Sequence, residues 1–455
     1  MNPTPPIFPL PQAYISRMNA FLGEEAASYF QSLEEPYCRG IRLNPRKPLT
    51  PEALEMLEGI GEAIPWCENG YHLSLESRAG AHPLHEAGAC YLQEPSAMIP
   101  VGILAPKPGE RVLDLCAAPG GKSTQIADEL AGDGLLVSNE PVPSRAKVLS
   151  GNLERMGVSN ALVVSALPEK LTPLWPEIFD AILVDAPCSG EGMFRRHPES
   201  RSEWNESTPA GCAQRQKHIL QSAGQMVRPG GRMVYSTCTF NPEENEQVIE
   251  NFLNHNPDWH TAAFAVPVGG GQTLKAPEGM AHFYPHQIQG EGHFAALLLR
   301  DGKDQAADSL FRPAQAAFKA PDAAALRAFE NWAGEFPDAA LPRANALFGE
   351  TLIAAPLLPP LAGVKVLRAG VSLGVVKGKA FVPDHALALT LSPESGIPAL
   401  SLTEEEAALW LHGEALPDPE EGHGWALVTL AGLPLGWCKR SDGWLKNHYP
   451  KGLRK

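Results

Sequence analysis

The sequence lacks any long apolar run. No stretch of its 455 residues approaches the length of a membrane-spanning helix. The first residues, MNPTPPIFPLPQ, contain prolines where a secretory signal would carry a charged end and an apolar helix. We therefore expect no membrane association and a cytoplasmic location. At this length, with 44% apolar residues, we expect two or three domains with substantial cores.

Paired cysteine motifs are also missing. The chain has eight cysteines, at positions 38, 67, 90, 116, 188, 212, 238 and 438. None forms a C-x-x-C pair, and no histidine pair has the spacing of a zinc finger, so we expect no metal site. A disulfide framework is not expected at this density in a cytoplasmic chain. Most of the thiols should be small buried side chains.

Positive charge is scarce, and much of it is concentrated at one end. The net charge of −15 argues against indiscriminate binding to nucleic acid. Residues 401–421 hold seven acidic side chains and no lysine or arginine, whereas residues 436–455 hold six basic side chains and one aspartate. Aromatic rings lie between these basic residues, which suits phosphate contacts combined with stacked bases. A solubilising tail, the plainer alternative, would lack tryptophans. We expect an RNA-contact module that binds phosphates through Lys439, Arg440, Lys446, Lys451 and Arg454.

The middle of the chain alternates strand-like and helix-like patterns. This βαβ succession predicts an α/β fold, with a mostly parallel sheet covered by helices on both faces. The predicted strands lie within 111–119, 135–141, 160–165, 179–188 and 232–238, and the predicted helices are 122–134, 144–158, 212–227 and 242–256.

The flanking regions suggest further domains. A proline-punctuated region, 1–95, precedes the α/β core, which extends over 96–300. Residues 301–355 are rich in alanine in their first part and are expected to be a helical connecting segment. Short strand-like runs recur in 356–455, which predicts a small β-rich domain.

The stretch DLCAAPGGKST (114–124) lies at the first turn from strand to helix. Ligands of open parallel sheets bind beyond the carboxyl ends of the strands. Gly120 and Gly121 allow close approach to the backbone, and the following helix offers free N–H groups. Glu140 ends the next strand, where nucleotide-type cofactors have their ribose hydroxyls bound.

Two phosphate-binding interpretations of this stretch fail. A P-loop requires glycine five residues before Gly121, and Cys116 stands there. The dinucleotide pattern G-x-G-x-x-G is also absent. A loop of small residues and one proline fits S-adenosylmethionine better, because this cofactor has no phosphates.

Two cysteines follow the ends of predicted strands. Cys188 comes three residues after Asp185, in VDAPC, and Cys238 follows YST. Both should lie at the edge of the sheet that carries the cofactor loop. A redox pair would normally be C-x-x-C, and a metal site lacks further ligands. A thiol nucleophile beside a methyl donor could activate an electron-poor pyrimidine. A buried structural role is the plainer alternative for either cysteine alone.

Four stretches resemble the Nol/Nop/Sun family of RNA cytosine-5 methyltransferases, and within it the bacterial enzymes that act on 16S ribosomal RNA. They are DLCAAPGGK (114–122), VDAPCSGEGMFRR (184–196), YSTCTFNPEENE (235–246) and HQIQGEGHF (286–294). The resemblance covers essentially the whole chain, including a C-terminal part similar to PUA domains. It implies a Rossmann-like methyltransferase core that uses S-adenosylmethionine, with RNA-contact domains at 1–95 and 356–455.

The resemblance also implies roles for individual residues. Cys238 would attack carbon 6 of cytosine, and Cys188 would help to release the product. Asp185 and Lys122 would lie between cofactor and base. The cofactor contacts would be Cys116, Ala117, Ala118, Pro119, Gly120, Gly121, Lys122, Glu140 and Asp185.

One position departs from the family. Members usually place a polar or acidic residue for the adenine amino group after the third strand, where this chain has Leu167. Adenine would then be held by backbone groups or Ser165, with a weaker hold on the cofactor.

The implied partner is ribosomal RNA or the small ribosomal subunit, bound by a monomer without a protein partner. A non-catalytic assembly factor and a nucleotide hydrolase are the alternatives. Both cysteines and Lys122 are present, which disfavours the assembly factor, and Cys116 disfavours the hydrolase.

Overall fold

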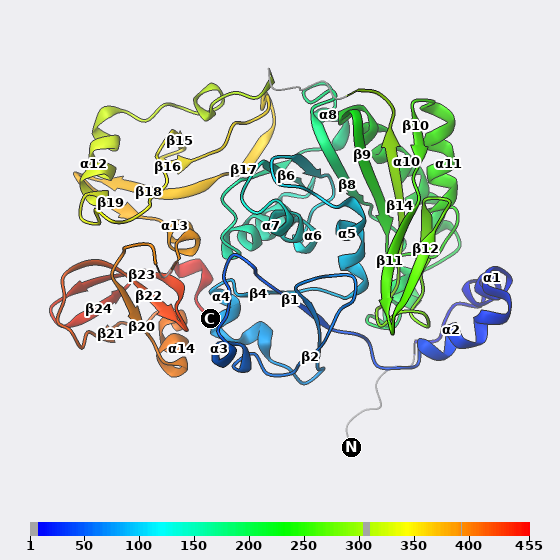
Figure 1. Ribbon diagram of the computed structural model, residues 1–455, viewed down its shortest axis with the longest axis horizontal. Helices are drawn as coiled ribbons and strands as arrows, with labels where there is room; N and C mark the ends of the chain where they lie inside the picture. The colour runs from blue at the N-terminus through cyan, green and yellow to red at the C-terminus, as the bar shows by residue number, and fades with distance from the viewer. Residues whose placement is uncertain (1–7, 304–309, 393) are drawn as a thin grey trace.

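The computed structural model describes residues 8–303, 310–392 and 394–455. Within them, nine strands form a central sheet, ordered β10-β14-β9-β8-β5-β6-β7-β17 with β13 beside β14 (Figure 1). Its parallel part comprises β5 (Arg111–Asp114), β6 (Leu135–Asn139), β7 (Ala161–Ser165), β8 (Phe179–Asp185) and β9 (Val227–Thr237). The first four strands lie where the sequence predicts them, whereas β9 begins at Val227, five residues before the predicted strand 232–238, and includes the RPGG stretch. The α/β fold class is confirmed.

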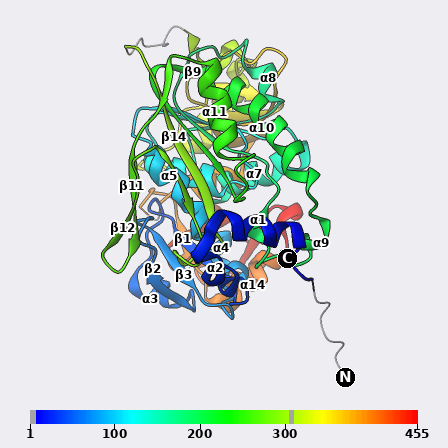
Figure 2. The ribbon, with the colours of Figure 1, turned by 90° about the vertical axis from the view of Figure 1, so that its right-hand side faces the viewer.

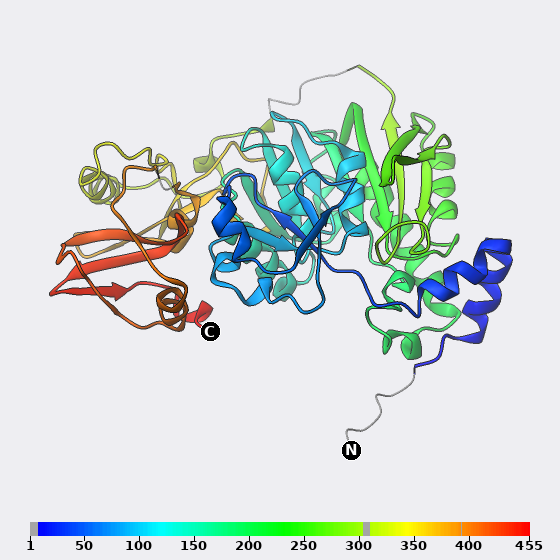
Figure 3. The ribbon, with the colours of Figure 1, turned by 60° about the horizontal axis from the view of Figure 1, so that its bottom comes forward.

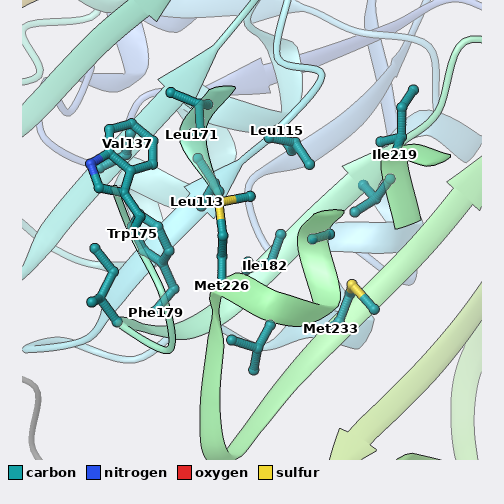
Figure 4. Close-up of a cluster of buried hydrophobic side chains, with 14 of the residues drawn as sticks. Leu113, Leu115, Val137, Leu171, Trp175, Phe179, Ile182, Ile219, Met226 and Met233 are labelled. Atoms are coloured by element: carbon teal, nitrogen blue, oxygen red, sulfur yellow. The ribbon is translucent and has the colours of Figure 1, made fainter. Parts of the chain in front are cut away.

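Helices cover both faces of the sheet because successive strand residues point to opposite sides. Val112 and Leu183 pack in one apolar layer, with α5 (Ile99–Leu104), α6 (Gly121–Glu129) and α7 (Pro143–Arg155). Leu113 and Ile182, one residue along, pack in the other layer, with α8 (Pro168–Leu171), α10 (Ser207–Met226) and α11 (Glu246–His255). Figure 4 shows part of this second layer, in which Trp175 and Met226 lie close to Leu113.

The strand order creates a crevice at one edge of the sheet. From β5 the chain moves outward to β6 and then β7, and it later returns to the other side of β5 as β8. The helices that follow β5 and β8 therefore leave in opposite directions. Such a switch point, at the carboxyl ends of the strands, is where open α/β sheets bind ligands.

Antiparallel strands complete this end of the sheet. β14 (His293–Arg300) pairs with β9, and β10 (Trp259–Thr261) and β13 (Met280–Phe283) pair with β14. Between β10 and β13 in the sequence, β11 (Phe264–Gly269) and β12 (Gln272–Ala276) form a separate hairpin. The pairing places His293, the first residue of β14, beside the end of β9.

The N-terminal region divides into two parts that lie apart. A helical hairpin, α1 (Gln12–Leu22) and α2 (Ala26–Ser32), lies at the opposite end of the molecule from the C-terminal domain (Figures 1 and 3). A small antiparallel sheet follows, with two short helices. Its elements are β1 (Gly40–Leu43), β2 (Ile60–Ala63), β3 (Gly70–Leu73), β4 (Cys90–Leu92), α3 (Pro51–Glu55) and α4 (Pro83–Glu86).

The segment 301–355 is only partly the helical connection that the sequence predicts. Its described residues contain α12 (Ala323–Ala333), but also β15 (Ala346–Phe348) and β16 (Thr351–Ala354). Alanine favours helix, yet prolines at 313, 321, 337 and 342 interrupt the pattern, because proline cannot continue a helix. The two strands join a sheet with β18 (Val371–Lys377) and β19 (Ala380–Pro383). The strand that lies between β16 and β18 in the sequence, β17 (Lys365–Ala369), belongs instead to the central sheet, where it pairs antiparallel with β7.

The last part of the chain is rich in strands, as expected. Its core packs against the N-terminal sheet, since Trp410 and Leu435 share one apolar cluster with Ile41 and Leu73. The elements are α13 (His385–Thr390), β20 (Ala399–Ser401), α14 (Glu404–His412), β21 (Leu416–Pro417), β22 (Gly424–Leu430), β23 (Leu433–Ser441) and β24 (Trp444–Asn447). Among the described residues, no helix is long and apolar enough to cross a membrane.

Candidate active site

The polar residues singled out in the sequence gather at the crevice. Asp114 ends β5, Asp185 ends β8, and Cys238 directly follows β9. Because these strands are parallel neighbours, their carboxyl ends meet at one edge. Glu140 follows β6 at the same edge, and the Cys116–Lys122 loop connects β5 to α6. The structure therefore brings the predicted cofactor loop and both predicted thiols together.

The thiols of Cys188 and Cys238 are in contact, with 3.3 Å between their sulfur atoms. Both side chains are partly exposed. Their loops are joined by further bonds: Gly192 N donates to Cys238 O at 2.7 Å, and the Ser189 and Thr239 hydroxyls lie 2.9 Å apart. A side chain at Gly192 would place its Cβ 2.9 Å from Cys238 O, so glycine is needed for this close approach.

The buried carboxylate of Glu244 stabilises the Cys188 loop by hydrogen bonds. It accepts hydrogen bonds from Ser189 N at 2.9 Å and from Gln216 Nε2 at 2.9 Å, and it is fully buried. Gln216 Nε2 also donates to Pro187 O. This role explains why the helix predicted at 242–256 begins only at Glu246: Glu244 and Asn245 are engaged with the thiol loops, Asn245 through Thr237 and Thr239.

Asp185 is the centre of a polar network between the cofactor loop and the thiols. Lys122 Nζ donates to its Oδ2 at 2.8 Å, and Ser236 Oγ donates to its Oδ1 at 2.8 Å. His293, which is buried, places Nε2 3.4 Å from the same Oδ1. The network joins α6, β8, β9 and β14, and it fixes the carboxylate in one orientation.

The charges in this network stabilise one another. Burial opposes ionisation of Asp185, but Lys122 and His293 outweigh it and hold the pKa of that carboxyl well below its usual range. Burial likewise opposes a charged Lys122, yet Asp185 raises the pKa of the ammonium above its ordinary value. The hydrogen bond with Cys238, together with burial, raises the pKa of Cys188 well above that of a free thiol. Cys188 therefore stays protonated and can donate toward the Cys238 sulfur.

The cofactor loop is held by side chains of the neighbouring helix α7. Asn152 Nδ2 donates to Pro119 O at 2.9 Å, and Arg145 Nη2 donates to Ala118 O at 3.0 Å. Gly120 has a positive φ of 118°, which glycine adopts without strain. At the base of the loop, burial raises the pKa of Asp114 to about 7. Its Oδ2 accepts from Ser123 Oγ at 2.6 Å, while Oδ1 makes no hydrogen bond within the described residues.

A cleft of about 970 Å³ runs from Glu140 to the thiols. That volume is at the upper end for a small-molecule site and leaves room for two ligands. Glu140 is buried at its wall, with Oε1 bound to Val142 N at 2.9 Å and Oε2 3.3 Å from Arg145. Such a carboxylate suits a vicinal ribose diol. With the backbone of the 116–122 loop, the cleft fits S-adenosylmethionine, as expected.

The cleft is apolar at Leu167, the position that departs from the family. The Leu167 side chain is 47% exposed and lines the cleft, so it can cover a ring face. Ser165 Oγ donates to Pro141 O at 3.2 Å and is therefore already engaged. Of the two possibilities that the sequence left open, this favours backbone groups for the adenine edge.

The basic C-terminal side chains differ in their environments. Lys439, Lys446 and Lys451 are exposed. Arg440, in contrast, forms two bonds to the Asp418 carboxylate, at 2.8 and 2.9 Å, and one to Glu420 at 3.1 Å. Its guanidinium is engaged within the fold. Of the rings nearby, Trp437 is buried in the core, whereas Trp444 is 49% exposed.

Sequence reasoning missed several residues of this site. Glu244 and His293 lie inside two of the quoted stretches, PEENE and GEGHF, but no spacing marked them. Ser236 could have been found, because residues two apart on a strand share a face and Cys238 follows by two. Arg215 and His218 of α10 line the cleft on its exposed side, and only the fold brings them there.

All eight cysteines lie within the described residues, and each is a free thiol. In the same part of the chain, no group of three or more histidine, cysteine, aspartate or glutamate side chains is arranged to hold a metal ion.

Comparison with protein families agrees with this site. The family described as 16S rRNA methyltransferase RsmB/F matches residues 101–299. The N-terminal domain of 16S rRNA methyltransferase RsmF matches residues 10–95, its first C-terminal domain matches 331–391, and its PUA domain matches 398–455. The matches thus extend over the core and both flanking regions.

Individual relatives match over nearly the full length. Ribosomal RNA small subunit methyltransferase F of Klebsiella pneumoniae (strain 342) is 34% identical, with 97% of this chain and 96% of the relative covered. The protein of the same name from Escherichia coli (strain 55989 / EAEC) is 32% identical, with the same coverage.

Among solved structures, PH0851 is 31% identical, with a TM-score of 0.58 over 64% of this chain and 66% of that chain. The NSun6 structure from Pyrococcus horikoshii with SFG is 22% identical and shares the fold, with a TM-score of 0.56 over 66% of this chain and all of that chain. This chain belongs to the RsmB/F family of 16S ribosomal RNA methyltransferases.

Proposed function

We propose that this enzyme methylates carbon 5 of cytosine in 16S ribosomal RNA through a covalent bond between Cys238 and the base. The observation that carries the proposal is the pair of contacting thiols at the mouth of the cofactor cleft. Carbon 5 of cytosine is a poor nucleophile, and addition of a thiolate to carbon 6 is the direct way to activate it. A thiolate is intrinsically very nucleophilic, which suits Cys238 to this step.

The reaction needs an electrophilic methyl group, which S-adenosylmethionine supplies on its sulfonium. Cys238 adds to carbon 6, and the electron pair of the ring double bond moves to carbon 5, which attacks the methyl. A base then takes the carbon-5 proton, the double bond re-forms, and the Cys238 thiolate leaves. The protonated Cys188 lies where it can donate a hydrogen bond to that departing sulfur. Cys188 thus assists the final elimination.

The Lys122–Asp185 contact links the cofactor loop to the strand that leads into Cys188, and we assign both side chains to the base. Addition at carbon 6 places extra electron density on the ring nitrogen and carbonyl. The ammonium of Lys122 offsets this charge, and the carboxylate of Asp185 can accept from the cytosine amino group. Their 2.8 Å contact keeps both groups charged. Fixed charges of this kind stabilise a transition state without reorganising.

The RNA must present an unstacked cytosine to this cleft. Arg215 and His218 line its exposed side, and we assign them to the phosphates on either side of the target base. Farther away, we assign phosphate contacts to Lys439, Lys446, Lys451 and Arg454, and we leave out Arg440 because its guanidinium is engaged. The N-terminal domain provides additional contacts.

The enzyme acts in the cytoplasm, on ribosomal RNA or the small subunit, and as a monomer. Size-exclusion chromatography with light scattering tests that part of the proposal directly, since a stable dimer would elute at twice the mass of 48.9 kDa.

Methyl transfer to RNA tests the main proposal. Purified enzyme, tritiated S-adenosylmethionine and 16S ribosomal RNA from a strain that lacks the gene should give labelled 5-methylcytidine after nuclease digestion. Label in another nucleoside would overturn the choice of atom, and absence of label in naked RNA and in 30S subunits alike would favour the assembly factor. Bisulfite sequencing of ribosomal RNA from the same strain locates the cytosine.

A further inference from the structure

A second buried carboxylate, Glu191, stands three residues after Cys188. Its side chain is fully buried, and no step of the proposed reaction uses it. Oε1 accepts from Arg17 Nη2 at 2.6 Å and from Trp204 Nε1 at 3.1 Å, while Oε2 accepts from Phe240 N at 3.2 Å. Phe240 stands two residues after Cys238, so this one carboxylate binds both thiol loops.

The cation that neutralises Glu191 comes from the far N-terminus. Arg17 lies on α1, and its guanidinium lies 5.3 Å from the centre of the Tyr14 ring and 5.5 Å from that of Trp204. Trp204 follows the short helix α9 (Ser200–Glu203). Figure 2 shows α1 close to α9, which lies far from it in the sequence. The α1–α2 hairpin therefore supplies the cation that is paired with the Glu191 carboxylate.

The same hairpin is also held by contacts that do not involve the Glu191 carboxylate. Tyr14 and Tyr29 are buried against Tyr284 and Phe240 in one aromatic cluster. On its outer side, Glu25 accepts from His286 Nε2 at 2.9 Å and from Gln287 Nε2 at 3.0 Å. Docking of the hairpin and neutralisation of Glu191 are thus separable by mutation.

We propose that Arg17 is a positioning residue, and that the N-terminal hairpin sets the alignment of Cys188 and Cys238 by neutralising Glu191. A buried carboxylate without a paired cation is strongly disfavoured. When Arg17 is absent, the Cys188 loop must move to hydrate Glu191, and the bonds from Glu191 to Phe240 and from Gly192 to Cys238 break with it. The importance of that alignment for methylation rests on the proposed function, but the alignment itself does not.

Closure of a disulfide between the two thiols measures their alignment without RNA. Oxidised glutathione forms a mixed disulfide with one cysteine, and the second displaces glutathione. Two thiols lose two electrons and two protons in total, and oxidised glutathione becomes two molecules of glutathione. The closure rate, followed by peptide mass mapping, depends on how often the sulfur atoms meet in line.

Arg17→Met keeps the side-chain stem and removes the charge. We expect closure to slow by about tenfold to a hundredfold, because displacement of reacting groups by about 1 Å has effects of that size. Glu25→Gln is the matched control: it weakens the outer anchor of the same hairpin and should change closure by less than about twofold, as exposed ion pairs contribute little. S-adenosylmethionine binding should be unchanged in both variants.

The double variant Arg17→Met/Glu191→Gln tests the mechanism. A neutral glutamine needs no paired cation, and its single amide oxygen can keep the bond from Phe240 N while the bond from Trp204 is lost. Closure should therefore return to within about threefold of the unmodified protein. If Glu191→Gln fails to rescue Arg17→Met, or if Glu25→Gln slows closure equally, the contact only docks the hairpin and the proposal is wrong. Unchanged closure in Arg17→Met overturns it as well.

A parallel measurement keeps the two proposals distinct. The rate of methyl transfer under single-turnover conditions should fall in Arg17→Met and recover in the double variant. If closure follows this pattern while the unmodified enzyme labels no cytosine, the positioning role stands and the proposed function fails.

Discussion

Lys122 Nζ lies 2.8 Å from Asp185 Oδ2, and this contact joins the first turn of the cofactor helix to the strand that leads into Cys188. The Lys122 side chain is only 10% exposed, so the pair is largely shielded from water. One ion pair thus links the methyl-donor side of the site to the thiol side.

Replacing Lys122 by methionine should remove the ion pair that links the cofactor loop to Asp185. Ser236 would remain as a hydrogen-bond donor to Asp185, but the charge would be uncompensated. We expect the rate of methyl transfer to fall by about a hundredfold to a thousandfold, a typical loss for one preorganised electrostatic group. The measurement is single-turnover transfer at saturating cofactor. Lys147, an exposed lysine of α7, gives a matched control in Lys147→Met; a similar loss there would discredit the assignment.

The two cysteines should fail differently when each is replaced by alanine. Cys238→Ala removes the attacking thiol and should bind RNA and cofactor without forming adduct or product. Cys188→Ala leaves the attack possible and impairs the elimination, so the covalent complex should accumulate. A denaturing gel of each variant with ribosomal RNA and S-adenosylmethionine shows the complex as a band that survives boiling in detergent.

If Cys188 were the nucleophile and Cys238 assisted release, the stable covalent complex would appear in Cys238→Ala instead. Purely structural thiols would give no band in either variant, and both would lose about 1 kcal/mol of stability, as is usual for a small deletion. Cys212→Ala, a change of a partly exposed cysteine of α10, serves as the control and should behave like the unmodified enzyme.

Glu140 should determine the affinity for the cofactor. In Glu140→Ala we expect the dissociation constant of S-adenosylmethionine to rise by about tenfold to a hundredfold, because charge-assisted hydrogen bonds contribute about 1.5–3 kcal/mol. Calorimetry measures this in the absence of RNA. Glu169, an exposed carboxylate that lines the same cleft, provides the comparison; equal losses in Glu169→Ala would indicate a general effect of charge.

Asp114 should make the protein less stable as the pH rises. Its pKa is about 7 in the folded protein against 3.8 in the unfolded chain. Between these values the folded state retains a proton that the unfolded state has lost, so stability falls as pH rises through this window and is constant above it. Asp114→Asn lacks this effect and should be more stable above pH 7, by up to about 4 kcal/mol.

Thermal melting of both proteins from pH 4.5 to 8.5, without cofactor, checks the expectation. The difference in melting temperature should grow with pH and level off above about 7, following the pKa. A difference that is constant with pH would mean that Asp114 does not titrate in this range.

The exposed C-terminal lysines should govern RNA affinity and its salt dependence. Changing Lys439, Lys446 and Lys451 to glutamine should weaken binding and reduce the slope of log K against log salt by about 0.7–0.9 for each phosphate that is no longer neutralised. Arg440→Gln should instead lower the melting temperature, because Asp418 loses its partner. Filter binding over a salt series separates these effects, and an unchanged slope in the triple variant would refute the assignment.

The strands of the core can be predicted from the sequence because each one is recognised from the residue pattern of a short segment. Each parallel strand is a short apolar run with a polar residue at its end, as in ILVD before Cys188, so both the strands and the active edge follow from the pattern. The site is less predictable where a side chain acts from a distant segment. Arg17 and Glu191 are 174 residues apart, and no periodicity connects them. Arg440 shows a similar limit, since charge clustering marked it for RNA contact and only the fold shows that Asp418 engages its guanidinium.

The strand β17 has a consequence for how this chain can be divided. It comes from the region after residue 355, yet it covers β7 at the end of the catalytic sheet, from Lys365 to Ala369. A fragment that stops at residue 300 would leave β7 with its backbone donors and acceptors facing solvent, which invites aggregation through that edge. β17 therefore belongs to the catalytic sheet in the fold, although it lies outside the catalytic region in the sequence.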